Sequence, residues 1–253
     1  MELSLFCDTY IINEYLRLKS MLEAMPRYKT GTHKGHSVIR EYKGTGVETV
    51  KRIAFENSPA YGEMHQQLLL YDNCKTQKKL FLDEIRRRHL NIPESFSIKN
   101  DTSDFNLAFW NSLIPCSNSH EIRTEYYDDY GYHVRSRGEM LIGNSLKDLG
   151  LEAKYEPCLY LKIGRKAHPD YSFPVPLIGR CFFIEFVGMT DNDEYINFNY
   201  GKTDEYMRNG ILPNRDLILL CGSETYLPSQ ETIKRIVSAF INTAVENIYN
   251  KKS

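Results

Sequence analysis

Two short runs of apolar residues, at positions 181–187 and 217–221, constrain most strongly what this chain can fold into. They read Cys-Phe-Phe-Ile-Glu-Phe-Val and Leu-Ile-Leu-Leu-Cys, so neither run alternates between apolar and polar residues. Strands that are apolar on both faces belong to sheets that are covered on both sides. Glu185 interrupts the first run, and a buried carboxylate without a partner costs several kcal/mol. A divalent cation is a good candidate for compensating this charge, and a buried ion pair is the competing explanation.

Helix and strand patterns flank these two runs and predict an α/β domain. Helices are expected over 138–149 and 192–208 and from Ser229 onward, where a long apolar stripe follows helical spacing. Further strands are expected over 153–163 and 170–175. The resulting order α-β-β-β-α-β-α predicts a mixed central sheet with helices packed on its faces.

The N-terminal part of the chain predicts a different organisation, a mainly helical arm. Apolar residues at helical spacing over 4–25 end at Pro26, and a second helical pattern covers 61–90. Between the two, β-like runs at 37–42 and 47–53 flank two glycines and predict a small hairpin. We therefore expect a basic arm, a connecting segment and an α/β domain, at residues 1–100, 101–130 and 131–253.

The distribution of charge points to nucleic acid as a partner, although a solvated helical surface explains it equally well. Residues 26–90 hold 13 Lys and Arg against 7 Asp and Glu, whereas the whole chain has a net charge of −1. A basic segment beside an acidic remainder is a footprint of nucleic-acid contact. The side chains expected to make such contacts are Lys75, Lys78, Lys79, Arg86, Arg87 and Arg88 in the arm, with Arg137 and Tyr206 in the α/β domain.

Cysteine usage and hydropathy indicate the compartment. The six cysteines are scattered and form no Cys-x-x-Cys pair, which argues against structural zinc and against a disulfide framework. No segment has the roughly 18 uninterrupted apolar residues that a membrane span needs. The N-terminus also lacks the pattern of a signal peptide. We therefore expect a cytoplasmic protein without a membrane partner.

Two further carboxylates stand near Glu185 in the predicted fold, and each also has a purely structural explanation. Glu139 lies on the core-facing side of its helix, which is unusual for a glutamate. Ser136 and Glu139 nevertheless form the S-x-x-E pattern of a capping box as well. Asp170 follows a proline at the start of a strand, where Pro-Asp is also a common turn element. Its interest comes from the expected proximity to Glu185.

These strands and the helix that follows them offer the groups for metal-assisted chemistry. Asp170 and Glu185 suit Mg²⁺ or Mn²⁺, and the backbone carbonyl of Phe186 is a candidate for a further position. Such an ion polarises a phosphate and lowers the pKa of a bound water. Lys202 shares a helical face with Tyr206, so its ammonium group either stabilises charge on the phosphate or extends along the apolar surface to solvent.

The motifs resemble those of the PD-(D/E)XK nuclease superfamily, which has the restriction-endonuclease-like fold. The similarity covers residues 131–215 and rests, in order, on VRSRGE, LGLEAKYEPCL, HPDYSF, FIEFVGM and K-x-x-x-Y-x-x-x-G-I. It implies that Asp170 and Glu185 bind the metal and that Glu139 is the acid of the preceding helix. The family usually has a lysine two positions after the second acid, where this chain has Val187. In some members the lysine lies on the next helix, which implies Lys202 as the replacement.

The resemblance implies an α/β fold with a restriction-endonuclease-like α-β-β-β-α-β core, preceded by the helical arm with its hairpin. It also implies a Mg²⁺- or Mn²⁺-dependent nuclease that hydrolyses phosphodiester bonds, with DNA as the expected substrate. Its catalytic residues would be Glu139, Asp170, Glu185 and Lys202. The alternative is a catalytically inactive nuclease-fold protein that acts as a scaffold for nucleic acid or protein, which Val187 favours. A protein partner or a second copy of the chain is compatible with both.

Overall fold

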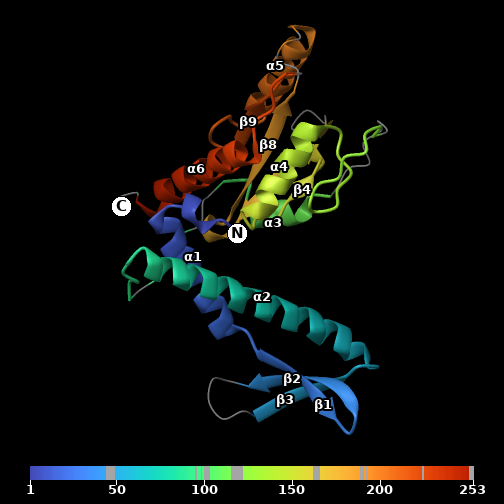
Figure 1. Ribbon diagram of the computed structural model, residues 1–253, viewed down its shortest axis with the longest axis vertical. Helices are drawn as coiled ribbons and strands as arrows, with labels where there is room; N and C mark the ends of the chain where they lie inside the picture. The colour runs from blue at the N-terminus through green and yellow to red at the C-terminus, as the bar shows by residue number, and fades with distance from the viewer. Residues whose placement is uncertain are drawn as a thin grey trace. The chain divides into compact units, whose positions relative to one another are not determined.

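The computed structural model of the chain divides into two compact units (Figure 1), one formed by Met1–Tyr10 with Ser97–Ser253 and the other by Ile11–Phe96. Each unit is described by itself. The structure describes residues 1–43, 49–94, 96–97, 99, 103–114, 122–161, 166–188, 191, 193–223 and 225–250, without the side chains of 43 and 193–198.

The smaller unit combines two helices with a three-stranded antiparallel sheet. Its helices are α1 (Asp8–Ala24), which begins in the other unit, and α2 (Pro59–Arg87). Its strands β1 (Arg27–His33), β2 (His36–Lys43) and β3 (Thr49–Phe55) are hydrogen-bonded in the order β1-β2-β3. One face of this sheet packs on α2 through a core that includes Tyr28, Ile39, Ala54, Met64 and Leu68.

The sequence predicted a two-stranded hairpin here, and strand β1 is an addition to it. The residues of β1, Arg-Tyr-Lys-Thr-Gly-Thr-His, hold a single buried apolar side chain, Tyr28, so their pattern carries little strand signal. The strand forms because Lys34 and Gly35, both with positive φ, close a two-residue turn onto β2. Such turns match the twist of the paired strands.

The larger unit is built on a mixed four-stranded sheet with the order β4-β7-β8-β9. Strands β4 (Lys154–Tyr155), β7 (Tyr171–Val175) and β8 (Arg180–Val187) pair antiparallel, and β9 (Leu217–Cys221) pairs parallel to β8. The two apolar runs of the sequence therefore lie side by side as β8 and β9. The predicted α/β class is confirmed at this level: helices and several sheets, with a mixed sheet at the centre.

The predicted continuous strand over 153–163 is wrong. Only β4 joins the central sheet, and β5 (Leu159–Tyr160) instead pairs with β6 (Lys166–Ala167) in a separate sheet of two strands. Glu156 lies between β4 and β5 with a positive φ of 40°, a conformation that a regular strand does not contain. Pro157 follows directly and is a local sign of the break, because a proline cannot donate to the hydrogen-bond ladder of a central strand.

Helices cover both faces of the four-stranded sheet, as the alternation of side chains along β8 shows. On one face, Phe182 contacts Phe240 of α6 (Gln230–Tyr249), and α4 (Arg137–Asp148) packs beside α6 (Figure 1). On the other face, Phe183 contacts α3 (Leu107–Ser112) and shares a core cluster with Tyr206 of α5 (Asp193–Arg208). Along the described residues, no helix is long and apolar enough to cross a membrane.

Candidate functional site

Glu185 lies in the middle of the sheet, on the face that α5 covers, and its carboxylate is paired. The side chain is almost fully buried, with 4% of its surface exposed. The Nζ atom of Lys202 contacts one carboxylate oxygen, and the Tyr206 hydroxyl donates a hydrogen bond of 3.1 Å to the other. Because Lys202 and Tyr206 are one helical turn apart on α5, a single helix supplies both partners. The ammonium group thus reaches the carboxylate from the helix that follows the strand.

Asp170 lies beside Glu185 at the edge where β7 begins. Tyr171 is paired with Ile184, and one step further along this register Asp170 comes opposite Glu185. Opposed residues of antiparallel strands project from the same face of the sheet. The Asp170 carboxylate accepts a 2.6 Å hydrogen bond from the backbone amide of Phe186. Asp170 keeps part of its surface exposed, and so does Lys202, with 28% of its side chain exposed, whereas Glu185 between them is buried.

Glu139 at the start of α4 is both a helix cap and a neighbour of the two acids. Its amide and its carboxylate both bond the Ser136 hydroxyl, at 3.1 and 2.9 Å. The other carboxylate oxygen accepts from the Arg135 amide at 2.9 Å and from the Tyr155 hydroxyl at 2.7 Å. The expected reciprocal cap is therefore present in a modified form, in which Arg135 rather than Ser136 donates its amide. Glu139 therefore both caps α4 and lies near Asp170 and Glu185.

The three carboxylates influence one another electrostatically. Burial raises the pKa of Asp170 well above its usual range, and the charges of Glu185 and Glu139 raise it further. Burial also raises the pKa values of Glu185 and Glu139. The Lys202 ammonium group opposes these shifts, because it lowers the pKa of both Asp170 and Glu185. Glu139 also lies near Arg135, which is ion-paired with Glu156. Burial and the repulsion between the acids together favour either protons or a further positive charge at this cluster.

The donor set fits a small divalent cation of the magnesium type. Within the part of the chain that the structure describes, no three His, Cys, Asp or Glu side chains converge as a ready metal cage. Mg²⁺ does not need such a cage, because one or two carboxylates, waters and substrate oxygens commonly hold it. Asp170 and Glu185 would supply the carboxylates. The carbonyl of Phe186 lies on the same edge of β8 as the amide that bonds Asp170, which keeps it available as a third oxygen.

The residues expected to contact nucleic acid have different surroundings. Arg87 and Arg88 are ion-paired with Glu84, and these bonds lower the pKa of that carboxyl to about 2. Arg86 pairs with Asp83 at 3.6 Å. Lys75 and Lys79 are exposed on α2, Lys78 is partly exposed there, and Arg137 is exposed in the first turn of α4. Tyr206 is 1% exposed and bonds Glu185, so its place is inside the site and not on a nucleic-acid-binding surface.

Sequence reasoning missed the groups that hold the acids in place. Tyr155 bonds Glu139, and Arg135 forms an ion pair with Glu156, whose amide in turn donates to the Asp170 carbonyl at 2.9 Å. The carbonyl of His168 accepts a 3.2 Å hydrogen bond from Lys202. None of these contacts follows from spacing along the chain. The only available signal was the density of polar residues in VRSRGE and HPDYSF.

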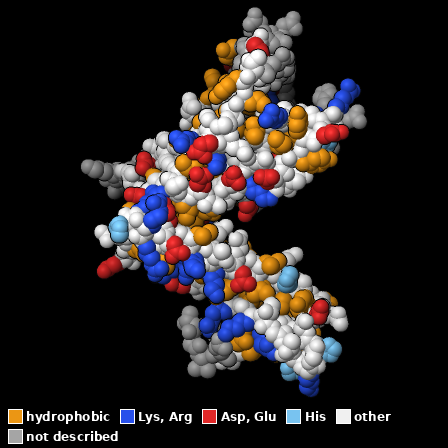
Figure 2. All heavy atoms as spheres, in the orientation of Figure 1, with side chains coloured by type: hydrophobic (Ala, Val, Ile, Leu, Met, Phe, Trp, Pro, Cys, Tyr) orange, Lys and Arg blue, Asp and Glu red, His pale blue; other side chains and the backbone are white. Residues whose placement is uncertain are grey.

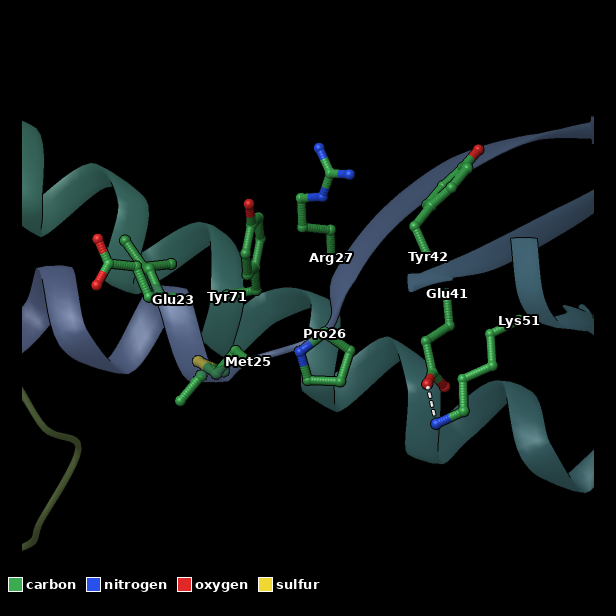
Figure 3. A pocket seen from close by; sticks show the side chains of 10 residues that line it. Glu23, Met25, Pro26, Arg27, Glu41, Tyr42, Lys51 and Tyr71 are labelled. Carbon is green, nitrogen blue, oxygen red and sulfur yellow. Dashed lines mark ion pairs between the residues drawn. The ribbon is translucent and has the colours of Figure 1, made fainter. Parts of the chain in front are cut away.

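A separate cavity of about 250 Å³ lies in the smaller unit and holds none of the site residues (Figure 3). Its walls come from the end of α1, from the sheet and from α2, including Glu23, Arg27, Tyr42 and Tyr71.

Comparison of the chain with protein-family models, with curated proteins and with solved structures found no match.

Proposed function

We propose that the larger unit is a Mg²⁺- or Mn²⁺-dependent nuclease that hydrolyses phosphodiester bonds, with DNA as the first substrate to test. The observation that carries the proposal is the pair Asp170 and Glu185, a partly exposed carboxylate directly before β7 and a buried one on β8, which the register of the two strands brings side by side. Burial raises the pKa values of both acids, and the charges of neighbouring acids add to these shifts. Strongly perturbed acids beside a charged partner are typical of functional sites.

The order of elements gives further support. From α4 to α6 the chain runs α-β-β-β-α-β-α through the central sheet, with β5 and β6 set aside. The PD-(D/E)XK resemblance implies this order, with one acid on the first helix, one acid on each of two adjacent strands and a lysine on the helix after them. In support, Glu139 lies on α4, Glu185 on β8 and Lys202 on α5, and Asp170 directly precedes β7.

In this proposal each residue has a stated task. Asp170 and Glu185 hold the metal ion, with the Phe186 carbonyl as a further donor. When bound, the ion supplies Lewis-acid polarisation of the phosphate and lowers the pKa of a bound water. Lys202 stabilises negative charge on the phosphate, since its Nζ lies at the Glu185 carboxylate and keeps an exposed surface. Tyr206 orients Glu185, and Glu139 adds negative charge while it caps α4.

The test is metal-dependent cleavage by the full chain and its variants. Linear, circular, single-stranded and branched DNA, and RNA, are incubated with Mg²⁺, Mn²⁺ or EDTA. We expect cleavage with a divalent ion and none in EDTA. Asp170→Ala and Glu185→Ala should each lower the rate by at least about 100-fold, a usual effect of removing a group that stabilises the transition state. Asp148→Ala, an exposed acid on α4, is the matched control and should cleave as the parent does.

Cleavage by both site variants at the parental rate would place the active site elsewhere. A parent chain that cleaves none of these substrates with either ion would contradict the proposal itself.

A second candidate, a nuclease fold that binds without cleaving, is favoured by one specific contact. The Lys202 ammonium group already neutralises Glu185, and it also bonds the His168 carbonyl. The Glu185 carboxylate therefore already has a partner of opposite charge. This agrees with the competing explanation of its position, a buried ion pair. Calorimetric titration with Mn²⁺ separates the two candidates: the nuclease requires a binding site that Asp170→Ala removes, and the scaffold requires none.

A further inference from the structure

The face of the smaller unit's sheet opposite α2 carries partly exposed side chains around Val38, which is 1% exposed. Tyr28, Ile39 and Ala54 point from the sheet into the core with α2. Side chains alternate along strands, so the residues between them project from the opposite face. The register places them in cross-strand rows, which include Lys29 with Arg40 and Ile53, and Tyr42 with Val50. We call this surface the outer face and define it by Lys29, His33, Arg40, Tyr42, Ile53 and Phe55.

The close-up of the nearby cavity supports this assignment (Figure 3). Arg27 and Tyr42 extend to one side of the strands, whereas Glu41 and Lys51 extend to the other and form an ion pair of 3.0 Å. Glu41 is also bonded to Arg52 and is 5% exposed. The acid of β2 is thus buried and paired on the inner side, while Lys29 and Arg40 lie on the outer face.

The outer face combines exposed rings and apolar groups with basic side chains. Phe55 is 41% exposed and Ile53 39% exposed, and the ring of His33 packs edge-on against Phe55. The Lys29 ammonium group lies 5.3 Å from the centre of the Tyr42 ring. None of the six positions that define the face is acidic. Figure 2 shows the surrounding surface of this unit, where Lys and Arg side chains gather beside apolar ones.

The guanidinium group of Arg40 is held against the strands of the outer face. Its guanidinium group donates a 2.9 Å hydrogen bond to the Thr32 carbonyl. It also lies directly over Gly31, because a Cβ atom at that glycine would overlap it. The group is therefore held against the strands, with a planar cation beside exposed rings. Planar cations and aromatic rings both stack on nucleobases.

We propose that the outer face binds single-stranded nucleic acid, with bases stacked on Tyr42, Phe55 and the Arg40 guanidinium group and phosphates contacted by Lys29 and Arg40. Unpaired bases offer faces on which rings can stack, whereas bases in a duplex are already stacked on one another. A basic face without acids attracts a polyanion such as nucleic acid. It would attract an acidic protein surface less specifically, because such a surface has no bases to stack on the rings. The inference goes beyond the proposed function, because binding here does not require that the carboxylate site cleaves.

The experiment measures binding of the full chain in EDTA, where cleavage plays no part. A fluorescent single strand of about 16 nucleotides, the upper end of the site size of small β modules, is titrated with protein and followed by anisotropy. Lys29→Ala with Arg40→Ala should weaken binding at least about tenfold and flatten the dependence of log K on log salt by roughly 1.4, as expected for two lost phosphate contacts. Phe55→Ala should weaken binding about tenfold through lost stacking.

Matched controls lie outside the outer face. Lys19→Ala with Arg235→Ala removes two exposed cations, one on α1 and one on α6, and Leu69→Ala removes an apolar side chain of α2 that is 56% exposed. Both should bind as the parent does, and circular dichroism establishes that all variants are folded. The proposal is overturned by stronger losses in these control variants than in the outer-face variants, by a parent chain without affinity for single strands, or by tighter binding to a duplex of the same sequence.

Discussion

At the scale of single residues, Lys202 governs how the acids of the candidate site titrate. Its ammonium group contacts Glu185 and lowers the pKa of both Glu185 and Asp170, against the raising effect of burial. Replacing it with Met removes this opposition, so both pKa values rise further. If the deprotonated acids are the active form, the rising limb of the pH–rate profile should move to higher pH, and the rate at neutral pH should fall by at least about tenfold.

The pH–rate profile distinguishes the loss of the Lys202 charge from a loss of side-chain packing. Lys202→Arg keeps the positive charge and should move the limb less than Lys202→Met does. Lys166→Met is the control. It removes a cation of β6 that lies over the Tyr160 ring of β5, and it should leave the pH–rate profile unchanged. If the rising limb of the Lys202→Met profile stays at the parental pH, with or without a lower rate, Lys202 does not set the charge state of the acids.

The sequence predicts residues of the candidate site where their type conflicts with their surroundings. Glu185 stands out because it is charged within an apolar strand, and Lys202 because it lies on the face of a helix that packs on the sheet. Tyr155 and Arg135 gave no such sign, because a tyrosine on a strand or an arginine before a helix is ordinary. The contact of Tyr155 with Glu139 depends on the register of β4 against β7, which no local pattern specifies, whereas the Arg135 amide bonds Glu139 locally at the start of α4.

At the scale of elements, the approach of α4 to the sheet depends on Gly138. A Cβ atom at this position would overlap the ring of Phe186 on β8. Gly138→Ala should therefore push the start of α4, and Glu139 with it, away from the sheet and destabilise this unit by about 1–3 kcal/mol, as overpacking of a core does. Urea unfolding followed by the fluorescence of Trp110, the chain's single tryptophan, reports on this unit.

Gly201→Ala is the matched control on α5. No atom lies within 4 Å of a Cβ built there, so alanine should stabilise the helix by about 0.5–1 kcal/mol. Opposite signs for the two substitutions are the expected result. Equal effects would show that helix propensity, rather than contact with Phe186, determines the outcome at Gly138.

Elements with strong periodicity were predictable, and elements held by tertiary contacts were not. The stripe of α6 and the apolar runs of β8 and β9 indicate their structures locally, because burial on one side or on both leaves a pattern in the sequence. Strand β1 lacks such a pattern, and the chain between β4 and β5 turns at Glu156, which directly precedes Pro157. In both places, hydrogen bonding to a neighbouring strand determines the structure of the chain.

At the scale of the whole molecule, the candidate site should cost stability at neutral pH when no metal is present. Asp170, Glu185 and Glu139 all have raised pKa values in the folded protein. The stability that such groups contribute is full below their unfolded pKa values, near 4, and is lost as the pH rises through the folded values. Glu84 of the other unit behaves oppositely: its pKa is lowered to about 2, so its contribution is lost only in acid.

Asp170→Asn tests this cost, because asparagine cannot ionise yet can still accept the hydrogen bond from the Phe186 amide. In EDTA at pH 8 the variant should melt a few degrees higher than the parent, at about 2–4 °C per kcal/mol for a chain of this size. Near pH 4 the difference should shrink, because Asp170 is protonated there in the parent. Asp148→Asn, exposed on α4, should change the melting temperature little at either pH. A parent that melts above Asp170→Asn at pH 8 would mean that the Asp170 charge is already compensated by the fold, and the strongest physical reason for a cation at this edge would be lost.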